Sequence, residues 1–183
     1  MNLSATNITD DNLRVIIQRA FSGGRKKCTG LILRDNFLTS IGVKMIVDAI
    51  VSSRSMIKYL SFSNNPDVRD DGIEHLVGLL GKNRHITFLA VPNTNITDRS
   101  VRLLADILCG VDPETTVPPL EKLYIAFNKG ITDESLPALV QIIEQNQTLK
   151  ILSLENCSLT DKARKSLRQM ISKNKKKKFS LTA

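Results

Sequence analysis

Few side chains in this sequence combine the type and the spacing that catalysis or metal binding requires. Two carboxylate pairs, Asp10-Asp11 and Asp70-Asp71, are of the kind used in general acid–base chemistry. Both pairs stand where a helix is expected to begin, and negative charge at that point offsets the helix dipole. No phosphate-binding glycine loop, H-E-x-x-H motif or C-x-x-C motif occurs in the sequence.

The two histidines and three cysteines do not supply the missing chemistry. His75 and His85 have no nucleophile partner at a motif spacing. The cysteines are odd in number and widely separated, which argues against a closed set of disulfides. Cys28 and Cys157 occupy repeat positions held elsewhere by Ile, Leu, Asn or Thr, and Cys109 ends an expected helix. We predict no catalytic residue, no metal ligand, no cofactor and no small-molecule substrate, and we interpret the protein as a non-enzyme.

The cysteines, the apolar runs and the first residues of the sequence indicate the cellular compartment of the protein. Unpaired cysteines fit a reduced, intracellular setting. No apolar run reaches the roughly 18–20 residues that a membrane span needs. The start, Met1-Asn2-Leu3-Ser4, shows no basic segment followed by an apolar run, so we expect no signal peptide. The prediction is a cytoplasmic protein, with a nuclear location left open.

A repeat positions the polar residues of the chain. The pattern L-x-L-x-x-C-x-L-T-D covers residues 152–161, and variants of it begin at Leu31, Leu60, Leu89 and Leu123. These leading leucines lie 29, 29, 34 and 29 positions apart. A fixed period of this size predicts a solenoid, with one strand and one helix in each repeat. The longer step contains a proline-rich loop at residues 110–119.

The pattern resembles the leucine-rich repeat, and its period and the helix after each strand are similar to the ribonuclease-inhibitor-like class. That class includes tropomodulin, the Ran GTPase-activating protein and NOD-like receptors. The resemblance covers residues 1–172 and implies a right-handed α/β solenoid of one partial and five full repeats. It implies a parallel sheet on the concave face and helices on the convex face. It also implies a protein–protein interaction or scaffold module. The alternatives are a regulatory domain of GTPase-activator or receptor type, and a tropomodulin-like cytoskeletal binder.

The bends after the strands carry the polar residues that the resemblance explains. Asn36, Asn65 and Asn128 are expected to hydrogen-bond the turning backbone in the interior. Thr94 and Cys157 replace asparagine in two repeats, and the bend at Cys157 is expected to be the looser one. Threonines are well placed to cap the following helices: Thr39, Thr97, Thr132 and Thr160. In the helix that follows Thr97, we expect Leu104 to be fully buried.

The charge of the chain is uneven. The formal net charge is +8, but nine basic residues lie within residues 162–178, and the rest of the chain is close to neutral. The residues from 173 to 183 are predicted to form a basic, disordered tail. Binding to nucleic acid or an anionic membrane is therefore expected only through the Lys173–Lys178 segment.

The concave face is the candidate binding site. One large side chain flanks the leading leucine of each strand, and Phe127 is expected to lie beside this stripe. The predicted partner-binding residues are Ile32, Tyr59, Phe88, Tyr124, Phe127 and Ile151. A contiguous apolar strip on an open face is typical of a protein-binding surface, although neighbouring side chains of a sheet also stabilise one another.

The front edge of the solenoid has no capping segment in the sequence. Met1 and Leu3 stand at strand positions that are buried in later repeats. An unpaired strand edge favours pairing with another chain. Three interpretations stay open: further repeats before residue 1, a homodimer through the front edge, or a frayed first repeat.

Overall fold

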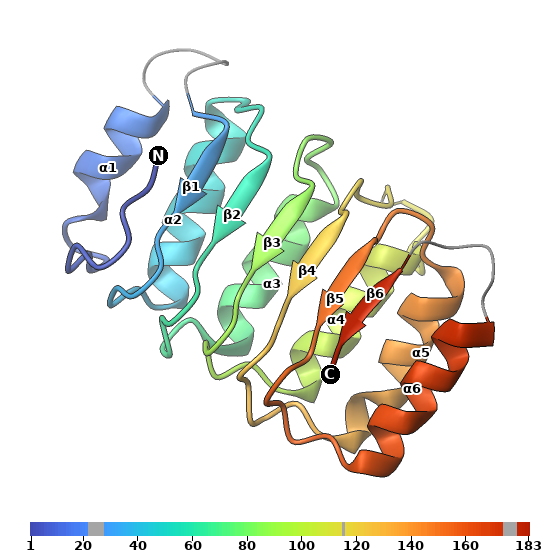
Figure 1. Cartoon of the computed structure of the whole chain (residues 1–183). Coiled ribbons are helices and arrows are strands. Elements are labelled where there is room, and N and C mark those ends of the chain that lie inside the picture. The colour runs from blue at the N-terminus through green and yellow to red at the C-terminus, as the bar shows by residue number, and fades with distance from the viewer. Residues whose placement is uncertain (22–27, 115, 174–178) are drawn as a thin grey trace.

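The protein is a two-layer solenoid with its strands on one side and its helices on the other (Figure 1). The computed structural model describes residues 1–21, 28–114, 116–173 and 179–183. The helices are α1 (Leu13–Phe21), α2 (Ser40–Ser52), α3 (Arg69–Leu80), α4 (Asp98–Cys109), the 3-10 turn η1 (Asp133–Ser135), α5 (Leu136–Gln145) and α6 (Asp161–Lys173). The strands are β1 (Gly30–Ile32), β2 (Tyr59–Ser61), β3 (Phe88–Ala90), β4 (Lys122–Tyr124), β5 (Ile151–Ser153) and β6 (Ser180–Thr182).

The described strands form one parallel sheet in the order of the sequence, β1 to β6. The leading leucines pair in register from strand to strand: Leu31, Leu60, Leu89, Leu123, Leu152 and Leu181. Each strand–helix–strand connection joins two neighbouring parallel strands. About 98% of such connections in proteins are right-handed. The predicted α/β solenoid with a parallel sheet is confirmed.

The core lies between the two layers and runs the length of the solenoid. The leading leucines of β1 to β5 and the apolar residues two positions after them are buried, as are the inner faces of the helices. Leu104 is fully buried in α4, as predicted. Gly42 is required at the start of α2 because a Cβ atom there would lie 2.2 Å from the Oδ1 atom of Asp10 in the preceding repeat. Neighbouring repeats therefore approach each other closely at the helix starts.

For reference, each repeat is numbered from the first residue of its strand. Repeat 1 covers residues 1–29, repeat 2 covers 30–58, repeat 3 covers 59–87, repeat 4 covers 88–121, repeat 5 covers 122–150 and repeat 6 covers 151–179. Strand β6 follows repeat 6 and begins a further turn of the same pattern.

Buried asparagines hydrogen-bond the bends, as predicted, and they also join consecutive repeats. The Asn128 side chain accepts from the backbone N–H groups of Thr94 and Ile96 in repeat 4 and donates to the carbonyl of Val91. It also donates to the carbonyls of Ile125 and Ala126 in its own repeat. Asn36 and Asn65 act in the same way toward repeats 1 and 2. We call this set of contacts the asparagine link.

Aspartates at the helix starts make a second connection between repeats. The carboxylate of Asp98 in repeat 4 accepts from the backbone N–H and the hydroxyl of Thr132 in repeat 5, both at 2.8 Å. Ser135 donates to the same carboxylate. We call this arrangement the aspartate link. Matching pairs are Asp10 with Thr39, Asp70 with Thr97, and Asp133 with Thr160.

The carboxylates of Asp70 and Asp98 are held in their charged form. Burial acts to raise the pKa of Asp70, but hydrogen bonds from Ser100 and Thr97 bring that pKa below its ordinary value. The same opposition applies to Asp98, where bonds from Ser135 and Thr132 outweigh burial and lower the pKa. The predicted threonine caps are present as well, because the Thr97 and Thr132 hydroxyls also accept from backbone N–H groups at the first turn.

The bend at Cys157 is supported by a residue from outside the bend. The Cys157 thiol donates a weak 3.5 Å hydrogen bond to the carbonyl of Ile125. The guanidinium of Arg164 in α6 donates to the carbonyls of Cys157 and Leu159, at 2.8 and 3.2 Å. The arginine thus supports this bend at carbonyls other than the counterparts of those that Asn128 bonds in repeat 5.

The chain after α6 differs from the predicted disordered tail. Helix α6 includes Lys173, and Ser180–Thr182 pairs with β5 as the sixth strand. Phe179 and Leu181 are partly buried against the core. The reason is in the period: Leu181 follows Leu152 by 29 residues and takes the leading-leucine position. Residues 174–178, on which the prediction of nucleic-acid or membrane binding rests, lie outside the described residues.

The first residues pair with β1, but not with the predicted burial. Leu3 donates its N–H to the carbonyl of Ile32, and Ile32 donates to the carbonyl of Met1. Leu3 is partly buried, whereas Met1 is 44% exposed, so the prediction of a buried Met1 is wrong. The Met1 side chain lies next to repeat 2 only, and this explains its exposure.

Candidate functional site

The predicted stripe of large side chains lies on the sheet face, but it forms two rows. Tyr59, Phe88 and Ile151 precede the leading leucine of their strands, whereas Ile32 and Tyr124 follow it. Positions before and after the leucine are two residues apart, about 7 Å along a strand. The predicted stripe is therefore staggered along the sheet. Lys122 also interrupts the first row, because it pairs in register between Phe88 and Ile151.

Three aromatic rings form the centre of this face. The ring centroids of Tyr59 and Phe88 are 5.9 Å apart, and those of Phe88 and Tyr124 are 5.2 Å apart. The rings are tilted by 50° and 38°, within the arrangements that favour aromatic pairs. Tyr59 remains 48% exposed. The rings thus brace each other across three strands and still present surface to solvent.

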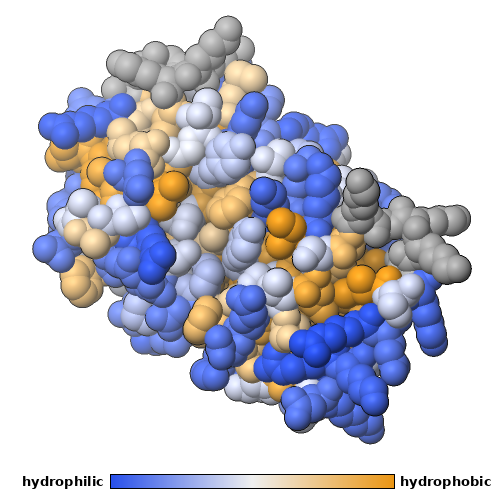
Figure 2. Space-filling model, in the orientation of Figure 1, coloured by the Kyte–Doolittle hydropathy of each residue, from blue (hydrophilic) through white to orange (hydrophobic). Residues whose placement is uncertain are grey.

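A hollow of about 390 Å3 lies beside these rings. Its floor is made by the small residues Ser61 and Ala90, which occupy the second row on β2 and β3. Four predicted site residues line it: Ile32, Tyr59, Phe88 and Tyr124. Figure 2 shows that hydrophobic and hydrophilic residues alternate over the sheet side, while strongly hydrophilic residues gather where α6 lies. The apolar part of the face is a local hollow and not a continuous strip.

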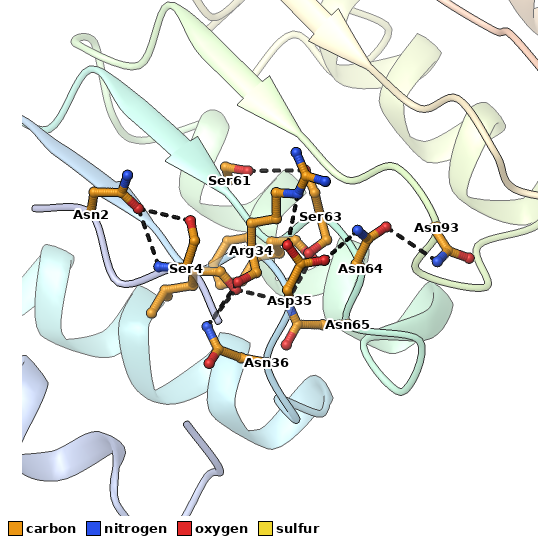
Figure 3. A network of polar contacts seen from close by, with 12 residues as sticks. Asn2, Ser4, Arg34, Asp35, Asn36, Ser61, Ser63, Asn64, Asn65 and Asn93 are labelled. Carbon is orange, nitrogen blue, oxygen red and sulfur yellow. Dashed lines mark hydrogen bonds and ion pairs between the residues drawn. The ribbon is translucent and has the colours of Figure 1, made fainter. Parts of the chain in front are cut away.

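The lower rim of the hollow is polar and ordered by hydrogen bonds (Figure 3). The guanidinium of Arg34, which lines the hollow, pairs with Asp35 at 2.9 Å. Asn64 donates to Asp35, and Asn93 donates to Asn64, so three bends in a row are joined side by side. These three bend residues adopt positive φ angles, a conformation that Asp and Asn tolerate better than most residues.

The remaining two predicted residues lie outside the hollow. Ile151 is partly exposed on β5, beyond Lys122. Phe127 stands at the bend after β4, in the position that Asp35, Asn64 and Asn93 hold in earlier repeats. It has a φ of 60° and is 52% exposed. A bulky side chain is uncommon in this conformation. Phe127 interrupts the row of polar bend residues, which Asn156 resumes in repeat 6.

Comparison with known proteins agrees with this geometry. A family model for the leucine-rich repeat matches residues 145–167, which include β5, its bend and the start of α6. The matched segment is 23 of the 183 residues of the chain and is similar to a leucine-rich repeat. The chain is also 27% identical over 180 residues to the Rho GTPase-activating protein gacW of Dictyostelium discoideum. The match covers 96% of this chain and 16% of that relative.

Two features of this sheet face were missed in the sequence. The hollow was signalled by the small partners of the large residues, Ser61 beside Tyr59 and Ala90 beside Phe88. Gly30 is the second feature, because a Cβ atom there would lie 3.2 Å from the Cβ of Tyr59. The tyrosine therefore leans over the glycine, and the lack of a side chain on β1 helps to set its position.

The reactive residues do not assemble at the hollow. His75 and His85 line two separate grooves at α2 and α3, on the helix side. Burial raises the pKa of the Cys157 thiol, which keeps it protonated. Within the described residues, no group of three or more His, Cys, Asp or Glu side chains is arranged to hold a metal ion. No helix in that part of the chain is both long and apolar enough to span a membrane.

Proposed function

We propose that this protein is a non-catalytic protein–protein interaction module that binds its partner on the sheet face, at the hollow over β1 to β4. The observation that carries the proposal is an apolar hollow, walled by three aromatic rings, on an open surface. Aromatic residues are enriched among those that dominate binding energy at interfaces. The volume falls at the low end of the roughly 300–1,000 Å3 typical of ligand pockets.

The physical argument is that the hollow is prepared before the partner arrives. The strands fix its floor, and the rings restrict one another, so little side-chain entropy is lost on binding. An apolar side chain of the partner would fill the space over Ser61 and Ala90 and remove the faces of Tyr59 and Tyr124 from water. Arg34 at the rim supplies a cation for a neighbouring carboxylate.

The test is to fill the hollow without touching its outer residues. Ala90→Leu places a branched side chain on the floor, while the Val51→Leu control changes an exposed residue of α2 on the opposite layer. Wild-type and variant proteins are used as baits for quantitative affinity capture and mass spectrometry. The expected result is a set of partners retained by wild type and Val51→Leu and lost by Ala90→Leu.

A second variant separates binding from stability. Tyr59→Ala combined with Tyr124→Ala should weaken binding of a captured partner by about 100-fold, from about 1–3 kcal/mol for each tyrosine. The loss of ring contacts should lower the unfolding free energy by only about 1 kcal/mol. Retention of the same partners by both hollow variants, with the fold intact, would contradict the proposal.

The second candidate is a regulatory domain of GTPase-activator type. It is supported by the 27% identity, over nearly the whole chain, to a segment of a Rho GTPase-activating protein. GTP hydrolysis by a purified Rho-type GTPase, with and without this chain, tests for catalysis. We expect the intrinsic rate in both cases, and an acceleration would overturn the non-catalytic proposal. We further infer the ribonuclease-inhibitor-like class, supported by the 29-residue step and the helix after each strand from β1 to β5.

A further inference from the structure

Two large apolar side chains stand exposed at the edge of the solenoid where strands lead into helices. Phe37 and Ile41 are each 64% exposed, more than any other large hydrophobic residue that the structure describes. Phe37 lies in the bend of repeat 2, and Ile41 is in the first turn of α2. Neither residue belongs to the hollow on the sheet face.

The matching positions of the other repeats show that this exposure is peculiar to repeat 2. At the position of Ile41, every other repeat has a charged residue: Asp11, Asp71, Arg99, Glu134 and Lys162. At the position of Phe37, the others have polar residues or glycine: Asn7, Asp67, Asn95, Gly130 and Ser158. Two positions that are polar throughout the rest of the solenoid are thus apolar together in one repeat.

The fold does not need these side chains. Phe37 holds its place through its backbone, whose N–H donates to the carbonyl of Ile8 at 2.8 Å. The N–H of Ile41 donates to the capping hydroxyl of Thr39. The apolar contact at the start of α2 is made by Leu38, which is fully buried. Rigid backbone and exposed apolar side chains together form a prepared contact surface.

The surroundings of this pair are acidic. The bends and helix starts of repeats 1 to 3 (residues 4–12, 33–41 and 62–71) contain six carboxylates and two guanidiniums. They are Asp10, Asp11, Asp35, Asp67, Asp70, Asp71, Arg34 and Arg69. Both arginines already pair with an aspartate of this set, at 2.9 and 2.7 Å, and Arg99 of repeat 4 pairs with Asp71 at 3.3 Å, which leaves more carboxylates than cations. The net charge around the pair is therefore negative.

We propose that Phe37 and Ile41 form a second docking surface, which binds a basic amphipathic segment of a protein partner. Apolar side chains of the segment cover Phe37 and Ile41, and its lysines or arginines face the carboxylates at the matching positions in repeats 1 and 3, Asp11 and Asp71. Charge complementarity of this kind sets orientation and speeds association, while the apolar pair supplies the contact that excludes water.

The chain offers a matched contrast on the same helix. Val51 lies near the other end of α2 and is 51% exposed. The basic residues of the two grooves that it lines outnumber the acidic ones: they are Lys44, Arg54, Lys82 and Arg84 against Asp48 and Glu74. An apolar residue in basic surroundings should not bind a basic segment. The two ends of α2 therefore separate charge complementarity from general apolar adhesion.

The probe is a synthetic peptide of lysine and leucine with one apolar helical face, about 14 residues long. Its counterpart has glutamate in place of lysine. Each peptide is titrated into the isotope-labelled full chain, and backbone amide shifts locate the contact. We expect the basic peptide to shift the amides of residues 37–41 and to bind more weakly as salt rises. We expect the acidic peptide to leave those amides unchanged.

Substitutions that imitate the other repeats complete the test. Phe37→Asn with Ile41→Gln should weaken binding of the basic peptide by about tenfold or more. Val51→Gln should leave it unchanged. Asp11→Asn with Asp71→Asn should reduce both the affinity and its salt dependence. Equal binding of both peptides, shifts located elsewhere, or full affinity in the Phe37→Asn, Ile41→Gln variant would overturn the proposal. Self-association of the chain that this variant abolishes would assign the surface to a second copy instead.

Discussion

The boundary between repeats 4 and 5 and the boundary between repeats 2 and 3 are built differently. Between repeats 4 and 5, both links are present: Asn128 bonds the bend of repeat 4, and Asp98 accepts from Thr132. Between repeats 2 and 3, only the asparagine link of Asn65 is present. Ser40 stands where an aspartate would be, and Arg69 stands where a threonine would be.

The boundary between repeats 3 and 4 shows the opposite choice. Thr94 replaces asparagine, and its hydroxyl donates only within its own repeat, to the carbonyl of Val91 at 2.7 Å. There the aspartate link of Asp70 with Thr97 and Ser100 is present. Each of these two boundaries thus keeps one link. The comparison teaches that either link is enough to hold neighbouring repeats in register, and that a boundary with both has a reserve.

The largest effect is expected where the asparagine link is cut at the doubly linked boundary. Asn128→Ala leaves the buried N–H groups of Thr94 and Ile96 without their side-chain partner. It also removes three hydrogen bonds to carbonyls, of which only that of Val91 keeps the Thr94 hydroxyl as a donor in the same repeat. Each unsatisfied buried group costs about 1–3 kcal/mol, so we expect a loss of about 3 kcal/mol or more in the unfolding free energy. Thr94→Ala removes one hydrogen bond and should cost about 1 kcal/mol. Urea unfolding followed by circular dichroism measures both, and equal losses would refute the hierarchy.

The next largest effect is expected at the boundary between β5 and β6, which is made mainly by strand pairing. Strand β6 pairs with β5, and the carbonyl of Thr182 accepts from the N–H of Leu154 at 2.6 Å. Phe179 and Leu181 are half-buried. Removing residues 179–183 should therefore cost about 2 kcal/mol, from two partly buried side chains. Amide exchange should then rise in residues 151–154 and stay unchanged in residues 88–91. An unaffected unfolding free energy would restore the prediction of a dispensable tail.

The aspartate links make stability depend on pH at the acidic end. The pKa values of Asp70 and Asp98 are lowered in the folded protein, so the unfolded chain binds more protons as the pH falls. The stabilisation from these carboxylates is complete above about pH 5, and it is lost as the pH falls through about 4 and below. Asp70→Asn with Asp98→Asn should flatten the dependence of the unfolding free energy on pH between about 5 and 3.

Asp106→Asn, at an exposed position of α4, provides the control for this pH effect. It should leave the slope of the unfolding free energy against pH as it is in the wild type. If the double variant also keeps the wild-type slope, the two carboxylates do not contribute through their charge, and the aspartate link is a neutral hydrogen bond only.

The sequence predicted the residues that recur at a fixed position of the repeat. It missed the contacts that depend on how neighbouring repeats stack. Leucine spacing, buried asparagines and threonine caps were all found, because each follows from one repeat read alone. The carboxylate of Asp98 and the hydroxyl of Thr132 are 34 residues apart, and only stacking brings them together. Strand β6 was missed because the lysines before it suggested disorder, although Leu181 keeps the 29-residue period.

The candidate site was predicted in the same partial way. Large residues on the strands were recognised, and four of the six named residues line the hollow. The hollow itself depends on Ser61 and Ala90 lying in register beside Tyr124, a relation between three strands that no single repeat shows. The exposure of Phe37 and Ile41 is visible only against the same positions in the other repeats.

The smallest expected effect concerns the boundary between repeats 5 and 6. There Cys157 makes one weak contact across the boundary, to the carbonyl of Ile125, and Arg164 supports the bend from α6. Cys157→Asn introduces a side-chain amide with two N–H donors in repeat 6, at the position that Asn128 holds in repeat 5. Because one net hydrogen bond is worth about 1 kcal/mol, we expect a gain of up to that amount.

The combination with Arg164→Ala makes this last prediction specific. In the wild type, Arg164→Ala should destabilise the bend, because the carbonyl of Cys157 loses its 2.8 Å partner. With Cys157→Asn present, the new amide should reach the carbonyls of Ile125, Leu154 and Glu155, the counterparts of those that Asn128 bonds. It does not reach the carbonyl that Arg164 bonds, so the cost of Arg164→Ala should stay the same and the coupling should be close to zero. A double-mutant cycle by urea unfolding measures this coupling. A smaller cost of Arg164→Ala in the Cys157→Asn background would contradict this expectation and mean that the arginine compensates for the missing amide.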